Sequence, residues 1–85
     1  MNESSLMAQI TASVRKVARV PRDVPITPDT CMIDDLRIDS LDLFAVVLEV
    51  QDRFDIVFEV EDLPRINRVG DLAAFVANYR QAAAA

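Results

Sequence analysis

Ser40 is the residue whose position in the sequence best suits covalent chemistry. It stands between Asp39 and Leu41-Asp42, in a segment expected to open a helix with Asp39 as its N-cap and Asp42 at the third helical position. A phosphate attached to Ser40 would meet free backbone N–H groups and the positive end of the helix dipole. Taken alone, these residues leave two interpretations open: Ser40 carries a phosphate-linked group, or it simply helps to cap the helix.

The composition excludes most other kinds of site. The chain has 85 residues with no His, one Cys and one Gly. Without His and with a single Cys, neither a zinc cluster nor a disulfide framework is expected, and a phosphate-binding glycine loop needs several closely spaced glycines. A chain this short buries only about 60% of its unfolded surface, which leaves room for one modest core and no deep catalytic cleft. We therefore expect a single domain over residues 1–85 that is not an enzyme and binds no metal.

The charge balance and the hydropathy pattern predict a cytoplasmic protein, and we expect it to be a monomer. Nine basic and fourteen acidic residues give a formal net charge of −5, and no basic stripe could neutralise a run of phosphates, so nucleic acid is not an expected partner. The N-terminal segment MNESSLMAQI lacks a basic region followed by an apolar run, and no uncharged apolar stretch of about 18 residues occurs, so no membrane insertion is expected. The single cysteine, Cys31, suits a reducing compartment. We expect it to serve as a small buried apolar residue.

Helical spacing and prolines outline the first half of the chain. Apolar residues recur every three to four positions from Glu3 to about Val20, which predicts an amphipathic helix that Pro21 ends. Residues 21–38 hold three prolines and are expected to form a long loop. Such a loop needs side chains that pin it to the core, and four apolar residues are available for this: Ile26, Met32, Ile33 and Leu36.

The second half predicts two more helices and one short turn. The second helix should run to about Phe54, residues 60–63 can form at most a single turn that Pro64 stops, and Asn67 is expected to cap the last helix. The closing alanines, residues 82–85, are expected to be a disordered tail. These elements predict an all-α fold: a small antiparallel bundle of three main helices plus one short helical turn, with a long loop between the first and second helices.

The second helix carries more apolar surface than one core contact needs. A stripe about 100° wide is typical of a face turned to the core, and it contains Leu43, Val46, Val47, Val50 and Phe54. A second apolar cluster lies nearly opposite and contains Leu41, Phe44 and Leu48. Three acids lie on the arc between the two, namely Asp42, Glu49 and Asp52. The second cluster therefore either meets a partner, or Phe44 and Leu48 pack beneath the long loop.

Two segments of this chain resemble the acyl carrier protein family around its modified serine: Leu36-Arg37-Ile38-Asp39-Ser40-Leu41-Asp42 and, after the helix, Phe54-Asp55-Ile56. The resemblance runs from about Leu36 to Val76, and the first helix and long loop also fit the family's layout. It implies that Ser40 receives 4′-phosphopantetheine from coenzyme A through a magnesium-dependent transferase, and that the terminal thiol of the arm holds acyl groups as thioesters. The cofactor then does the chemistry, while the protein supplies attachment, shelter and presentation.

Several features distinguish the chain from the housekeeping fatty-acid carriers of that family. Members usually have Gly in one of the two positions after the leucine that corresponds to Leu36, where this chain has Arg37 and Ile38. Housekeeping carriers commonly have Glu at the position of Ala45 and often Pro at the position of Glu59. The first helix is also markedly basic. These departures imply a specialised carrier.

The resemblance implies an acyl carrier for fatty-acid, polyketide or specialised lipid biosynthesis. A peptidyl or aminoacyl carrier resembles this sequence in fold and serine position, but Asp39 favours an acyl carrier, because peptidyl carriers more often have a small or uncharged residue before the serine. The alternative from a different class is an unmodified helical adaptor that binds a partner through Leu41, Phe44 and Leu48.

The implied partners are the phosphopantetheinyl transferase and the synthases and other enzymes that load, transfer or use the acyl group. We expect basic patches on these enzymes to meet the cap and the exposed side of the second helix, through Asp39, Leu41, Asp42, Leu48, Glu49 and Asp52. The acyl chain is expected to be sheltered between the second helix and the turn around residues 60–63, since burying each CH₂ is worth about 0.8 kcal/mol.

Overall fold

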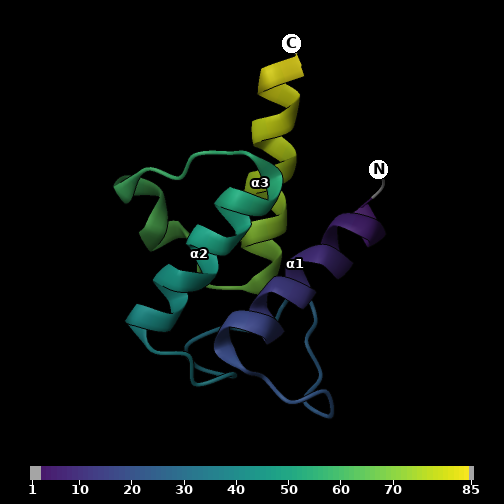
Figure 1. Cartoon of the computed structure of the whole chain (residues 1–85), viewed down its shortest axis with the longest axis vertical. Coiled ribbons are helices and arrows are strands. Elements are labelled where there is room, and N and C mark those ends of the chain that lie inside the picture. Colours follow the sequence, from purple (N-terminus) through teal and green to yellow (C-terminus); the bar gives the residue numbers. More distant parts are fainter. Residues whose placement is uncertain (1–2, 85) are drawn as a thin grey trace.

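Three α-helices and one 3₁₀-helix make up the computed structural model, which describes residues 3–84. The helices are α1 (Glu3–Ala18), α2 (Ser40–Phe54), η1 (Val60–Arg65) and α3 (Val69–Ala84). Helix α1 packs against both α2 and α3, and in Figure 1 it runs opposite to them, while the long loop passes beneath the bundle. This is the all-α arrangement predicted from the sequence, with the long loop between the first two helices.

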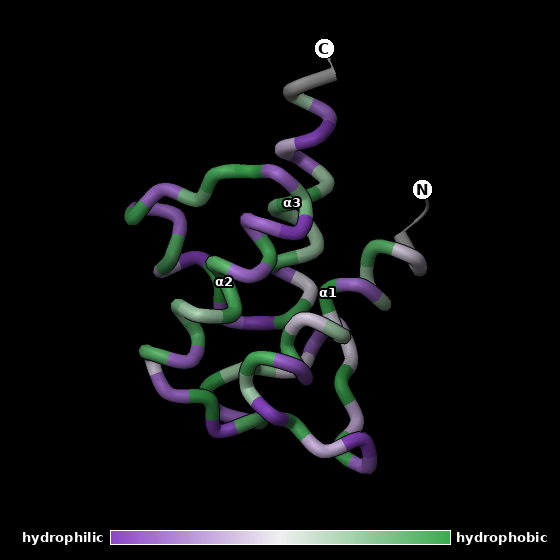
Figure 2. The backbone as a smooth tube through the Cα atoms, in the orientation of Figure 1, coloured by the Kyte–Doolittle hydropathy of each residue, from purple (hydrophilic) through white to green (hydrophobic). Residues whose placement is uncertain are grey.

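The core is built from the apolar stripes of the three α-helices. On α2 the predicted stripe is confirmed for Val46, Val47, Val50 and Phe54, which are buried, while Leu43 is half-buried. Figure 2 shows hydrophobic positions recurring along the helices and interrupted by hydrophilic ones, as expected for helices that bury one face. The remaining buried apolar residues come from α1, α3, the loop and the segment after α2: Leu6, Ile10, Val14, Met32, Ile38, Ile56, Ile66, Val69, Leu72 and Val76.

Helix α1 ends earlier than Pro21, and a left-handed residue ends it. The helix stops at Ala18, Arg19 has φ of 56°, and the N–H of Val20 donates to the carbonyl of Arg15 at 3.2 Å. A left-handed residue followed by this backbone bond is the Schellman helix ending. The Arg15 guanidinium then donates to the carbonyls of Pro21 (2.6 Å) and Val24 (2.9 Å). Pro21 therefore follows a completed ending and does not cause it.

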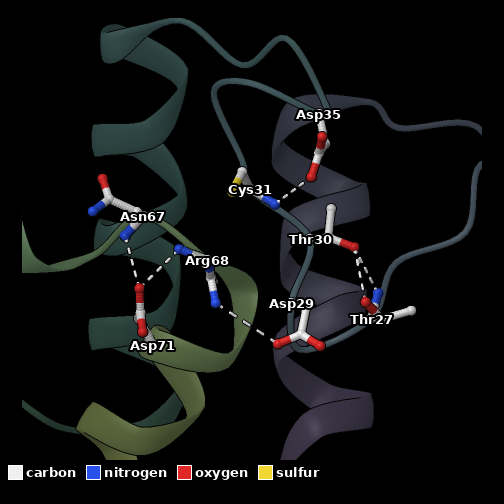
Figure 3. Close-up of polar contacts among 8 residues, drawn as sticks. All are labelled: Thr27, Asp29, Thr30, Cys31, Asp35, Asn67, Arg68 and Asp71. Carbon is white, nitrogen blue, oxygen red and sulfur yellow. Dashed lines mark hydrogen bonds and ion pairs between the residues drawn. The ribbon is translucent and has the colours of Figure 1, made fainter.

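The short helix and the last helix differ in their bounds from the sequence prediction. Pro64 lies inside η1, because its fixed φ suits a helix and only its missing N–H is lost. The cap of α3 is not Asn67: the Asp71 carboxylate accepts the N–H groups of Asn67 (3.0 Å) and Arg68 (2.9 Å), as Figure 3 shows. Residues 82–84, expected from the sequence to be a disordered tail, continue α3 in the structure, and Ala has the highest helix propensity. Residue 85 lies outside the described residues.

The long loop is anchored to the start of α3 by backbone hydrogen bonds. The N–H of Met32 donates to the Asn67 carbonyl (2.9 Å), and the carbonyls of Thr30 and Pro28 accept the N–H groups of Val69 (3.0 Å) and Gly70 (2.9 Å). Figure 3 shows the polar side chains that flank this contact, with Arg68 reaching Asp29 from the start of α3. Of the four apolar residues expected to pin the loop, Met32 is buried, Ile26 and Leu36 are half-buried and Ile33 is exposed.

Gly70 is required by how closely the loop approaches α3. A Cβ atom at this position would lie 2.8 Å from the carbonyl oxygen of Pro28, inside ordinary van der Waals contact, and the atom it would meet belongs to the backbone. The single glycine of the sequence therefore stands where the loop and the helix touch.

Glu49 connects α1 to α2. One carboxylate oxygen of Glu49 accepts the hydroxyl of Ser13 (3.4 Å) and lies 3.5 Å from the guanidinium of Arg53, and the other lies 3.8 Å from the ammonium of Lys16. Ser13 is fully buried, and the side chain of Glu49 is 19% exposed. The carboxylate, expected from the sequence to be among the docking residues, thus contributes to the packing of the two helices.

We predict that Glu49→Ala destabilises the protein while Asp52→Ala does not. The first change leaves the buried Ser13 hydroxyl without its acceptor and separates two cations from their partner, so the free energy of unfolding should fall by about 1–3 kcal/mol. Asp52 is exposed on the same helix, and its removal should change stability by less than about 0.5 kcal/mol. Urea denaturation followed by circular dichroism measures both. Equal stabilities for the two variants would contradict this account of Glu49.

Candidate functional site

Ser40 is the first residue of α2 and is exposed. Asp39 is the N-cap, as predicted: its backbone is extended (φ −79°, ψ 174°), its carboxylate accepts the N–H of Asp42 at 2.8 Å, and its carbonyl accepts the N–H of Leu43 at 2.9 Å. The first N–H groups of a helix have no partner within the helix. Ser40 therefore stands on the outside of a capped helix end, with the N-terminal amides and the positive end of the dipole beside it.

The segment before Ser40 is folded back on itself and pinned. The Cys31 carbonyl accepts the N–H groups of Asp35 (2.8 Å) and Leu36 (3.2 Å), and the Met32 carbonyl accepts the N–H of Ile38 (3.0 Å). Ile38 is buried two residues before Ser40. Burial of the Ile38 side chain in the core thus fixes the position of the backbone that leads into α2.

Arg37 occupies a left-handed conformation at φ 59°. Arg37 is at one of the two positions where, by the resemblance described above, Gly is usual. Gly adopts positive φ without a steric cost. A non-glycine residue held there costs on the order of 1 kcal/mol. Arg37 therefore adopts the left-handed backbone conformation that a glycine would favour. Burial of the neighbouring Ile38 side chain helps to hold it there.

Cys31 lies at the turn that begins this segment. Its N–H donates to the carboxylate of Asp35 at 2.8 Å (Figure 3), and its backbone forms an isolated antiparallel bridge with Arg68. The thiol is free and the residue is half-buried. The expectation of a small buried apolar residue is therefore met only in part.

The exposed side of α2 presents apolar and acidic groups together. Leu41 is 79% exposed and Leu48 46% exposed, and Asp52 is also exposed. Residues seven and eleven positions apart lie close to one line along a helix, so these three residues form one surface, which we term the α2 outer face. Asp39 and Asp42 are exposed beside Ser40 at its end. Of the six residues expected to bind partners, Glu49 alone is turned away, toward α1.

Phe44 and Leu48 border a hollow between α2 and η1, and they do not pack beneath the long loop as one interpretation of the sequence had it. This α2–η1 hollow has a volume of about 300 Å³. Its lining is mostly apolar and comprises Phe44, Val47, Leu48, Gln51, Val57, Phe58, Glu59, Val60 and Leu63. The Gln51 side-chain oxygen accepts the N–H of Phe58 at 3.0 Å, which fixes the segment between α2 and η1 along the rim.

Neither a candidate metal site nor a helix able to span a membrane occurs in the described part of the chain. Within residues 3–84 no group of three or more His, Cys, Asp and Glu side chains could hold a metal ion. Across the same span, no helix has the length and apolar character needed to cross a membrane.

Known proteins resemble this chain in sequence and in fold. A family model for the phosphopantetheine attachment site matches residues 8–76. An acyl carrier protein of Exiguobacterium is 31% identical over 77 residues, covering 89% of this chain and 95% of that protein. The meromycolate extension acyl carrier protein of Mycobacterium tuberculosis is 28% identical over 76 residues, covering 89% of this chain and 65% of that protein.

A solved structure agrees with this relationship. The structure belongs to a protein from Mycobacterium tuberculosis that is assigned as an acyl carrier protein, and it superimposes with a TM-score of 0.79 at 35% identity, covering 87% of this chain and 97% of that one. The family match spans most of the chain and includes the start of α2. The chain therefore belongs to the acyl carrier protein family, and it is a carrier and not an enzyme.

Proposed function

We propose that this protein carries acyl groups as thioesters on a 4′-phosphopantetheine arm attached to the hydroxyl oxygen of Ser40. The observation that carries the proposal is the exposed Ser40 at the start of α2, next to a cap that Asp39 and Asp42 complete. The N-terminal amides of α2 would stabilise the phosphate that links the arm to the protein. The arm, when present, supplies the thiol on which the acyl group is held.

Attachment requires that Ser40 be reached by a separate enzyme. The Ser40 oxygen would form a bond to the phosphorus next to the pantetheine half of coenzyme A, the bond between the two phosphates would break, and the nucleotide half would leave while the hydroxyl proton passes to the transferase. The exposed position of Ser40 meets this requirement. Cys31 suits a reducing compartment, and we propose the cytoplasm as the place of this function.

Within acyl carriers, we propose a specialised biosynthetic role. Ala45 and Glu59 depart from the residues common in housekeeping fatty-acid carriers. One of the relatives is named for meromycolate extension, which is consistent with a carrier outside the bulk fatty-acid pathway. Asp39 favours acyl over peptidyl cargo, because peptidyl carriers more often have a small or uncharged residue before the serine.

We predict that Ser40→Ala abolishes attachment of the arm and leaves the fold intact. Ser40 is exposed and its side chain is not part of the cap, so stability should change by less than about 0.5 kcal/mol. Intact mass is measured after incubation with coenzyme A, Mg²⁺ and a broad-specificity transferase. Ser5→Ala, a change at another exposed serine, is the matched control and should gain the mass of one arm. A mass gain in Ser40→Ala would show that the arm is attached elsewhere, and no gain in the unaltered protein would favour the unmodified adaptor.

The α2 outer face, together with Asp42, is the surface that we propose for docking of the transferase and the acyl-handling enzymes. Leu41 and Leu48 offer apolar contact next to the carboxylate of Asp52. Exposed charge pairs act mainly on association rate and register. Because Glu49 is engaged with α1, the acids that we propose for this contact are Asp39, Asp42 and Asp52.

We predict that Asp52→Lys slows arm transfer by about 1.5- to 5-fold at low salt, the range that follows from an exposed pair worth about 0.2–1 kcal/mol. Asp23→Lys is the matched control: it makes the same change of charge at an exposed acid in the long loop and should leave the rate unchanged. The initial rate of transfer is measured as a function of salt, and the difference should shrink as salt screens the charges. Equal slowing by both variants would indicate a net-charge effect and not a docking face.

The α2–η1 hollow is the place that we propose for the acyl chain. Its lining is mostly apolar, and none of the residues of η1 is buried. A short helix with little burial opens at low free-energy cost. A chain that leaves water for this hollow would gain about 0.8 kcal/mol for each fully buried CH₂.

A further inference from the structure

We propose that the stacked rings of Phe58 and Phe75 close the inner end of the α2–η1 hollow and set the longest acyl chain that this protein can shelter. The inference rests on the proposed function, because it concerns which acyl chains the carrier accepts. It identifies two residues that determine chain-length specificity, one in the segment before η1 and the other on α3.

The two rings leave no passage between them. Their centroids are 4.2 Å apart and their planes differ by 16°, which is stacking at contact distance. Phe58 lines the α2–η1 hollow, and Phe75 lines a second hollow of about 240 Å³. The pair is therefore a partition two rings thick between two spaces.

The chemistry of the surroundings changes across this partition. The second hollow is bordered by Asp62, Arg65, Ile66, Asp71, Ala74, Phe75 and Asn78. Two of these carboxylates are fixed by the backbone: Asp62 accepts the N–H of Glu59 (2.9 Å), and Asp71 accepts those of Asn67 and Arg68. These bonds cap the starts of η1 and α3. An alkyl chain that passed the rings would meet these polar groups, and each CH₂ buried beside them would gain less than in the α2–η1 hollow.

Contacts to α2 and α3 hold the two rings of the partition. The N–H of Phe58 donates to the side chain of Gln51 on α2 at 3.0 Å, and the ring of Phe75 stacks on Tyr79 of α3 with centroids 6.4 Å apart. Leu63 lines the hollow from the later part of η1, so movement there would widen the hollow while these two contacts hold the rings. The rings therefore limit the length of a bound acyl chain more strictly than they limit its width.

The test uses the full chain loaded at Ser40 with saturated acyl-phosphopantetheine of even lengths from C4 to C16, delivered from acyl-coenzyme A by a broad-specificity transferase. Melting temperature is measured for each acyl form relative to the arm-only form of the same variant, so that any stability change of the variant itself cancels. In the unaltered protein the melting temperature should rise by up to about 3–6 °C per fully buried methylene and then level off at one length. Phe58→Leu and Phe75→Leu should each move that limit upward by at least two carbons.

Phe44→Leu is the matched control, because Phe44 lines the same hollow one turn after Ser40 and is 49% exposed. It should leave the limit unchanged. As a second measurement that needs no variant, chains up to the limit should shift the NMR signals of Phe58 but not those of Ala74 and Asn78. The proposal is overturned if no length limit occurs, if Phe44→Leu moves the limit as far as the two ring variants, or if short chains already shift Ala74 and Asn78. Failure to load any arm would instead refute the proposed function, and mass spectrometry shows this before melting is measured.

Discussion

The rest of the structure depends on the contact between the long loop and the start of α3. Residues 19–39 contain no helix or strand, and a connection longer than about 12–15 residues is uncommon in a compact domain unless something holds it. Here the Pro28 carbonyl bonds the N–H of Gly70, and bonds at Thr30 and Met32 continue the contact. Because the loop ends at Asp39, the position of Ser40 depends on this contact. The contact joins loop residues to partners 35 to 42 positions further along the chain.

The parts of the site that the sequence predicted correctly are those in which cause and effect lie close together in the chain. Asp39 caps α2 through the N–H of a residue three positions on, so residue types alone indicate the cap. The core stripe from Val46 to Phe54 follows from helical periodicity, and its buried residues confirm it. Ser40 was thus recognisable as the first residue of a capped, acid-flanked helix before any long-range contact was known.

What the sequence did not predict depends on distant partners or on backbone strain. The contacts of Glu49 with α1 were not predicted, because its partners Ser13 and Lys16 lie on another helix. The stacking of Phe58 on Phe75 likewise joins separate segments, and no periodicity marks it. Three helix ends and turns use positive φ at Arg19, Arg37 and Asp55, where residue type gives no signal because glycine is the residue usually expected. The packing of the whole domain compensates for this local strain.

The most direct test of the dependence of Ser40 on the loop contact is amide hydrogen exchange, measured by NMR, in Gly70→Ala. The added Cβ would lie 2.8 Å from the Pro28 carbonyl oxygen. This overlap should destabilise the contact between the loop and α3 by about 1–3 kcal/mol, so the loop should open more often. The amides of Met32, Asp42 and Leu43 should then exchange about 5- to 100-fold faster, beyond any change at Val50 in the middle of α2. Faster exchange confined to Val69 and residue 70, with Asp42 and Leu43 unchanged, would contradict the account, because the helix start at Ser40 would then hold its shape without the loop contact.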